Sequence, residues 1–210
     1  MRMGMGSLSS AERTALARHG RRLEYFTIAW NSLEGLVAIG AGVFAGSVSL
    51  IGFGVDSFIE VTSGAALLWR MSGDDEGRRE HREAITLRIV GVCFVALAAY
   101  VGYEAVRDLV SSSAPRPSRI GIGLAAVSLV VMPILARAKR HVARALASGA
   151  MRADARQTDF CMYLSAILLA GLALNLVVGW WWADPIAALI MTPLIIKEGV
   201  SALRGDSCCD

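Results

Sequence analysis

Six long apolar blocks, separated by short polar stretches, follow the polar first 24 residues of the chain. They are Phe26–Ala45, Leu50–Trp69, Ile89–Val106, Ile120–Ala136, Phe160–Val178 and Pro185–Leu203. Each has about the 17–25 residues that an α-helix needs to cross a bilayer. None shows the two-residue alternation of a membrane β-strand. The pattern therefore predicts an all-α fold, an integral membrane bundle of six transmembrane helices.

Polar segments bound this predicted bundle. Residues 1–24 are polar and basic and contain no apolar stretch that ends in a signal-peptide cleavage site, so we expect a cytoplasmic N-terminal segment. Residues 25–203 form the predicted transmembrane domain, and residues 204–210 form a short cytoplasmic tail. The last block opens with Asp184 and Pro185. This pair predicts a helix start, because Asp is a good N-cap and Pro fits the first helical position.

The composition supports a membrane protein and excludes several other classes. Hydrophobic residues make up 55% of the chain and charged residues 19%, against about 25% charged in an average soluble domain. A disordered chain, a collagen and a disulfide scaffold do not fit these values. The four cysteines, Cys93, Cys161, Cys208 and Cys209, show no CxxC spacing. We expect them to be reduced or metal-bound, without a structural disulfide.

Basic residues set the expected orientation. Of the 21 Lys and Arg residues, all but Arg107, Arg116 and Arg119 fall on the side of the six-helix pattern that holds both termini. Basic residues are enriched on the cytoplasmic side of membrane proteins. We therefore expect both termini in the cytoplasm and the chain in a bacterial inner membrane as a multi-pass protein.

Three carboxylates interrupt the apolar blocks: Glu34 in the first, and Asp56 and Glu60 in the second. A carboxylate in a bilayer core is costly and usually marks a pathway or a partner. No Lys or Arg lies deep in any block, so we expect no basic partner. Asp56 and Glu60 are four residues apart and share one helix face, where a divalent cation would satisfy both. The alternative is protonated carboxyl groups that are hydrogen-bonded to neighbouring helices.

The fifth predicted helix carries a polar stripe at spacings of three and four residues. Its members are Asp154, Gln157, Thr158, Cys161 and Ser165. Cys161 is either a metal ligand or a small packing residue. Asp159 points away from this stripe, and we expect it at the cytoplasmic entrance. At 1.5 Å per residue, Asp56 lies roughly 10 Å and Cys161 roughly 25 Å from the external ends of their helices. One shared site requires a tilted or sunken second helix.

Three segments, SVSLIGFGVDSFIE, RADARQTDFC and GWWWADPIAALI, together resemble the cation diffusion facilitator family. The resemblance implies a homodimeric transporter that moves divalent transition-metal ions out of the cytoplasm in exchange for protons. It also implies a member without the family's cytoplasmic C-terminal domain. The family's DxxxD pair becomes Asp56 and Glu60. Gln157 and Cys161 stand where its fifth helix usually has HxxxD, and Glu34 or Asp154 would complete the ligand shell.

The donor types bear on which metal is carried. A thiolate favours softer ions such as zinc, and carboxylate and amide oxygens suit manganese. We expect Zn²⁺ as the transported ion, with manganese or iron as the alternatives. A membrane protein that binds metal without transporting it is a further alternative. Because no HExxH or GxSxG motif is present, we expect no enzyme and no catalytic cofactor, and we expect no nucleic-acid partner.

Overall fold

The computed structural model describes residues 9–71 and 76–204 of the chain, and these residues form six α-helices. The helices are α1 (Ser10–Ala45), α2 (Val48–Met71), α3 (Glu76–Ser111), α4 (Arg119–Ala145), α5 (Gly149–Val178) and α6 (Ala183–Arg204). Each contains one of the six apolar blocks. The predicted all-α bundle is therefore confirmed, and several helices extend beyond their apolar blocks into polar sequence.

The extension of α1 into polar sequence has a local cause. The Ser9 side chain accepts a hydrogen bond from the Glu12 backbone N–H, and the Glu12 carboxylate accepts one from the Ser9 backbone N–H. This capping box satisfies two of the free donors at the helix start. As a result, residues 10–24 of the predicted polar segment continue the first transmembrane helix as one rod.

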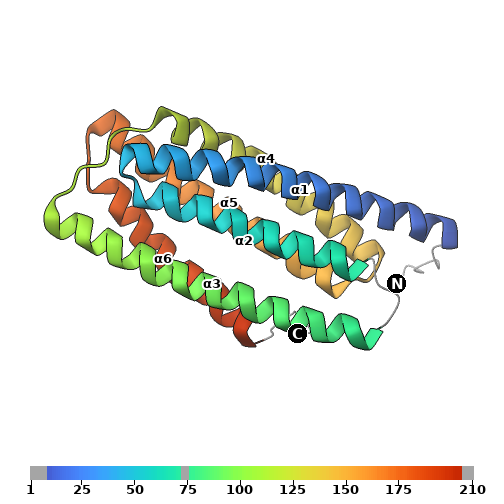
Figure 1. Cartoon of the computed structure of the whole chain (residues 1–210). Helices are drawn as coiled ribbons and strands as arrows, with labels where there is room; N and C mark the ends of the chain where they lie inside the picture. The colour runs from blue at the N-terminus through green and yellow to red at the C-terminus, as the bar shows by residue number, and fades with distance from the viewer. Residues whose placement is uncertain (1–8, 72–75, 205–210) are drawn as a thin grey trace, which may run out of the picture.

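Five of the described helices are long and apolar enough to cross a membrane by length and composition. They are α1, α2, α4, α5 and α6, with α5 qualifying over Asp154–Val178. The span predicted at Ile89–Val106 in α3 stays a prediction. Because the helices run up and down in succession, α1 begins and α6 ends at the same end of the bundle (Figure 1). We call this the inner end, since it is the one predicted to face the cytoplasm.

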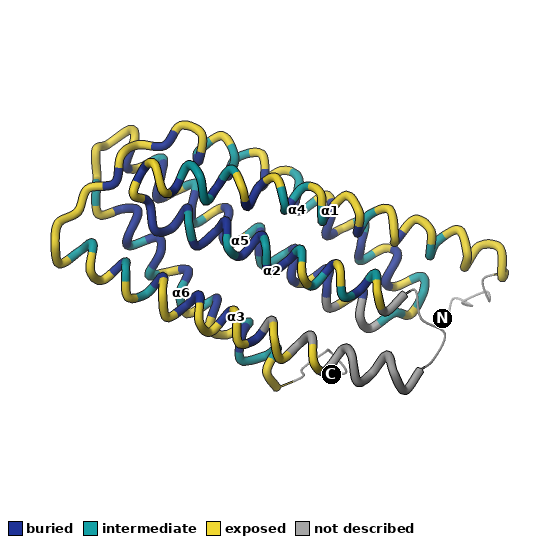
Figure 2. The backbone as a smooth tube through the Cα atoms, in the orientation of Figure 1, coloured by how far each residue is buried: buried dark blue, intermediate teal, exposed yellow. Residues whose placement is uncertain are grey.

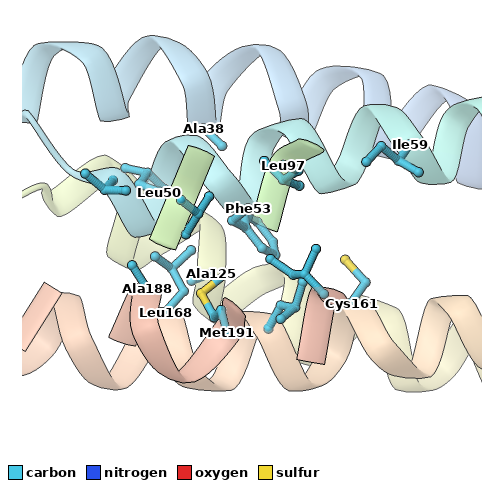
Figure 3. Close-up of a cluster of buried hydrophobic side chains, with 14 of the residues drawn as sticks. Ala38, Leu50, Phe53, Ile59, Leu97, Ala125, Cys161, Leu168, Ala188 and Met191 are labelled. Atoms are coloured by element: carbon cyan, nitrogen blue, oxygen red, sulfur yellow. The ribbon is translucent and has the colours of Figure 1, made fainter. Parts of the chain in front are cut away.

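The helices pack in three layers of two. The α1 and α4 helices form one outer layer, α3 and α6 form the other, and α2 and α5 lie between them (Figure 1). The main apolar core joins these layers and includes Phe53, Leu97, Leu168 and Met191 (Figure 3). Buried residues accordingly concentrate on the inner sides of the helices (Figure 2). Large apolar side chains such as Phe44 and Val177 are exposed on the outside, as expected of a surface that faces lipid. Side chains on α2 and α5 are therefore the most central ones in the molecule.

Glycines allow two of the helix pairs to cross closely. A Cβ atom placed on Gly54 of α2 would lie 3.0 Å from the Gly35 carbonyl oxygen of α1, and the reverse distance is also 3.0 Å. In the other pair, a Cβ atom on Gly91 of α3 would lie 2.9 Å from the Gly199 carbonyl oxygen of α6. Small residues at such crossings are typical of membrane helices, whose association depends on close packing.

Asp184 has a different role from the one predicted. Helix α6 already begins at Ala183, and the buried Asp184 carboxylate accepts hydrogen bonds from the hydroxyls of Ser47 and Ser49. The first of these bonds measures 2.6 Å between Ser47 Oγ and Asp184 Oδ1. Asp184 thus ties the start of α2 to the start of α6 instead of capping its own helix. The sequence offers no sign of this tie, because the two segments are far apart along the chain.

The described cysteines, Cys93 and Cys161, are both free thiols, Cys93 exposed and Cys161 buried. This agrees with the prediction that neither enters a structural disulfide. Cys208 and Cys209 lie outside the described residues, so the prediction for that pair stays as it was.

Candidate metal site

The acidic pair on α2 faces the interior of the bundle, as its helical spacing predicts. Asp56 is 2% exposed and Glu60 is 1% exposed. Ser49, Gly52 and Gly64 of the same face are buried as well. Small residues on this face let the neighbouring helices approach, and the two carboxyl groups are buried close enough to interact electrostatically with each other.

Cys161 of α5 lies beside this pair. Its side chain is fully buried and close enough to Asp56 and Glu60 to interact electrostatically with both. Figure 3 shows Cys161 with the buried apolar side chains of the main core. Asp56, Glu60 and Cys161 are therefore neighbours in the structure, and their sharing of one metal site stays a prediction.

The depth difference expected between Asp56 and Cys161 is about halved, because α2 begins deeper in the bundle than α5 ends. A Cβ atom on Gly121 would contact both Leu50 of α2 and Leu172 of α5, which places these two leucines at the same level. From that level Glu60 lies ten residues inward, about 15 Å, and Cys161 lies eleven residues inward, about 16 Å, at 1.5 Å per residue. Glu60 and Cys161 are thus level, with Asp56 one turn further out.

Glu34 of α1 adds a third carboxyl group to the cluster. It is 1% exposed, and its Oε2 accepts a hydrogen bond from Ser57 Oγ at 3.0 Å. It interacts electrostatically with both Asp56 and Glu60. Its other oxygen, Oε1, has no hydrogen-bond partner among the described residues. Glu34, one of the two additional ligands proposed from the sequence, therefore lies close to the acidic pair.

A buried basic residue that the sequence reasoning missed lies beyond the fourth apolar block. Lys139 of α4 is fully buried, and its Nζ lies 2.5 Å from Asp154 Oδ2 and 3.2 Å from Glu24 Oε2. The sequence places Lys139 just after an apolar block, among basic residues that look cytoplasmic. It nevertheless continues the buried face of α4, which includes Met132 and Leu135 at helical spacing.

Glu24 is a second functional candidate that the sequence reasoning missed. It precedes the first apolar block, so hydropathy assigns it to the polar segment. Its spacing to Thr27, Asn31 and Glu34 follows the helical period, and all four residues are buried on one face of α1. The helical spacing of polar residues continues past the edge of the apolar block, and this signal in the sequence could have identified Glu24.

The polar stripe on α5 is buried as predicted, and its members have different partners. Asp154 pairs with Lys139, whereas Thr158 Oγ1 donates a hydrogen bond to Glu60 Oε1 at 2.7 Å. Gln157 is 8% exposed, and its Nε2 has no hydrogen-bond partner among the described residues. Asp159 lies off the stripe and pairs with Arg140.

The cluster is not a finished coordination shell. Within the described residues, no three His, Cys, Asp or Glu side chains are grouped tightly enough to hold a metal ion. Buried carboxylate oxygens nevertheless lack partners, among them Glu34 Oε1 and Glu60 Oε2. Buried polar atoms normally have a partner, so these oxygens are available to accept a hydrogen bond or to serve as ligands.

Comparison with known proteins identifies the family. A sequence model of the cation efflux transmembrane domain matches residues 25–206, which is most of the chain. The chain belongs to the cation efflux family. The matched region contains all six candidate ligands and Lys139, and Glu24 lies one residue before it.

The proteins to which the chain is similar share about a quarter of its residues. An uncharacterized transporter of Synechocystis sp. is 28% identical over 176 residues, covering 79% of this chain and 56% of the relative. Transmembrane protein 163 of Xenopus laevis is 24% identical over 186 residues, covering 86% and 65%. The cation-efflux pump FieF of Salmonella typhi is 27% identical over 159 residues, covering 73% and 53%. The chain thus spans between about half and two thirds of the length of these relatives.

Proposed function

We propose that this member of the cation efflux family exports divalent transition-metal ions from the cytoplasm, Zn²⁺ first among them, in exchange for protons. The observation that carries the proposal is the meeting of Asp56, Glu60 and Cys161 at the centre of the bundle. Support comes also from the relatives, since one of them is named a cation-efflux pump.

Exchange of a metal ion for protons follows from the chemistry of these side chains. Carboxyl and thiol groups must lose their protons to bind a metal, so metal binding releases protons and proton binding releases metal. Asp56 and Glu60 are almost fully buried, and a buried cluster cannot hold several negative charges without a compensating cation. A cluster of this kind alternates between a metal-loaded and a protonated state, which is the property that an antiporter needs.

The preference for zinc rests on Cys161. Cys, Asp and Glu together supply donors that a tetrahedral zinc site accepts, and a thiolate disfavours manganese relative to softer ions. Glu34 is the proposed fourth ligand, and Gln157 is the weakest candidate because an amide is a poor zinc ligand. Asp154 is a less suitable ligand than Glu34, since Lys139 already pairs with it. Manganese or iron export by the same fold is the alternative.

The proposal includes the setting of the transporter. The bilayer is the partner of the exposed apolar side chains on the outside of the bundle. We place the protein in a bacterial inner membrane as a homodimer with both termini in the cytoplasm. Labelling from either side of the membrane tests the position of the termini, and the mass of the solubilised protein tests the homodimer.

Metal flux into proteoliposomes tests the function directly. Purified protein in vesicles with a proton gradient should accumulate Zn²⁺ faster than empty vesicles, and Mn²⁺ and Fe²⁺ assayed in parallel define the substrate. Asp56→Asn should abolish this flux. Glu104→Gln is the matched control, because Glu104 is a carboxylate on α3 that pairs with Arg107, and its flux should stay at the wild-type level. Equal flux from the wild type and Asp56→Asn would refute the site.

A further inference from the structure

The side chain of Lys139 joins three helices near the inner end of the bundle. Its Nζ contacts Glu24 of α1 at 3.2 Å and Asp154 of α5 at 2.5 Å, and it lies 3.4 Å from Thr158 Oγ1. An ammonium group has three donors and no acceptor, so all three donors are used. Lys139, Glu24 and Asp154 are at most 3% exposed. One buried side chain therefore cross-links α1, α4 and α5.

This cross-link lies between the candidate metal site and the inner end. Asp154 is seven residues, about 10 Å, on the inner side of Cys161 along α5. Thr158 lies between them, accepts a hydrogen bond from Lys139 and donates one to Glu60. Lys139 also interacts electrostatically with Glu60. The cross-link is thus connected to the metal site by a single hydroxyl group.

An apolar layer backs the cross-link on its inner side. A second cluster of buried side chains, separate from the main core, consists of Leu67, Val142, Ala143 and Met151. Val142 and Ala143 follow Lys139 by about one turn towards the inner end, and Met151 precedes Asp154 by about one turn. A water-filled route from this end to Cys161 would therefore have to part both the apolar layer and the ion cross-link.

We propose that Lys139 is the latch of an inner gate. Its ion pairs hold the inner ends of α1 and α5 against α4, and their release opens the route between that end and Cys161. Lys139 is a positioning residue in this scheme, because it acts through Thr158 and the helix ends and does not bind the transported ion. The inference rests on the proposed function, since a gate has a use only where an ion passes.

Three variants separate a latch from a general loss of structure. Lys139→Met removes the ammonium group at similar length, but it leaves two buried carboxyl groups without their cation, which can prevent folding. Asp154→Ala avoids this problem, because it keeps a balanced pair between Lys139 and Glu24 and removes only the ion pair to α5. Lys139→Arg retains the positive charge and serves as the conservative control.

The reactivity of Cys161 reports the opening of the gate. Cys93→Ala, Cys208→Ser and Cys209→Ser leave it as the sole thiol. A membrane-impermeant thiol reagent is applied to vesicles of either orientation. Labelling of a separate Ala147→Cys protein in the same vesicles shows which side of the bundle faces the reagent. Asp154→Ala should raise the rate from the inner side at least about tenfold, since one broken buried ion pair shifts an opening equilibrium by more than a decade. The outer-side rate should not change, and Lys139→Arg should react as the parent does.

The outcomes distinguish this inference from the proposed function. Folded Lys139→Met should behave as Asp154→Ala does; if it does not fold, Asp154→Ala decides. An unchanged inner-side rate in Asp154→Ala overturns the latch, and so does an equal increase from both sides, which indicates general loosening. If wild-type vesicles carry no metal but the side-specific increase is found, the latch stands and the transport proposal falls. If wild-type vesicles carry metal but the labelling rate of Cys161 is unchanged in Asp154→Ala, the transport proposal stands and the latch falls.

Discussion

The close crossing of α1 and α2 makes a quantitative prediction about Gly54→Ala. The added Cβ atom would lie 2.8 Å from Ile39 Cγ1, 3.0 Å from Ala38 Cβ and 3.0 Å from the Gly35 carbonyl oxygen. The side chain of Ile39 can move, but the carbonyl oxygen belongs to the backbone of α1. The two helices must therefore separate by a few tenths of an ångström to restore ordinary contacts.

The size of the effect follows from two opposed terms. Overpacking of this kind costs about 1–3 kcal/mol, and replacing Gly by Ala inside a helix gains about 0.8–1.0 kcal/mol. Gly40 of α1 provides the matched control, because a Cβ atom there has nothing within 4 Å. Both substitutions gain the same propensity, so the difference between them isolates the crossing. We expect Gly54→Ala to be less stable than Gly40→Ala by about 1–3 kcal/mol.

Reversible unfolding of the purified protein in mixed micelles, followed by tryptophan fluorescence, measures this difference. Gly54 lies two residues before Asp56, and Gly35 is next to Glu34, so zinc flux per folded molecule should also fall in Gly54→Ala and not in Gly40→Ala. Equal stabilities of the two variants would refute the reasoning, because they would mean that α1 and α2 can separate at Gly54 without a loss of folding free energy.

The remaining predictions concern the site and the orientation. Asp56→Ala should abolish metal flux in a folded, membrane-inserted protein, and Glu60→Gln should reduce it, because each removes a buried anionic donor; metal uptake by proteoliposomes checks both, and wild-type flux in Asp56→Ala contradicts the site. Ser112→Cys and Ala147→Cys replace exposed residues that both have positive φ, 52° and 50°, in a background without native cysteines. Impermeant reagents should label the first from outside and the second from the cytoplasm, and the reverse result would overturn the orientation. Cys161→Asp should shift the flux ratio of zinc to manganese towards manganese, because a carboxylate is a harder ligand than a thiolate. If this ratio is unchanged, and the zinc affinity of Cys161→Ser is unchanged as well, Cys161 is a packing residue.

Local and periodic properties of this protein could be predicted from the sequence alone. Hydropathy identified the six helices, because a bilayer demands continuous apolar stretches of a set length. The helical period put Asp56 and Glu60 on one inward face and collected the α5 stripe around Cys161, since the spacing of 3.6 residues per turn is a property of the backbone itself. These features depend on neighbours within one helix, and the sequence contains that information directly.

Features that depend on how deeply one helix sits against another came only from the tertiary structure. The level at which α2 begins relative to α5 decides whether Glu60 meets Cys161, and packing around Gly121 sets that level. Helix packing nearer the inner end buries Lys139 and pairs it with Glu24 and Asp154, although hydropathy places all three in polar segments. A charged residue at the end of an apolar block is solvated or buried according to its neighbours on other helices, because only a partner of opposite charge offsets the cost of its desolvation.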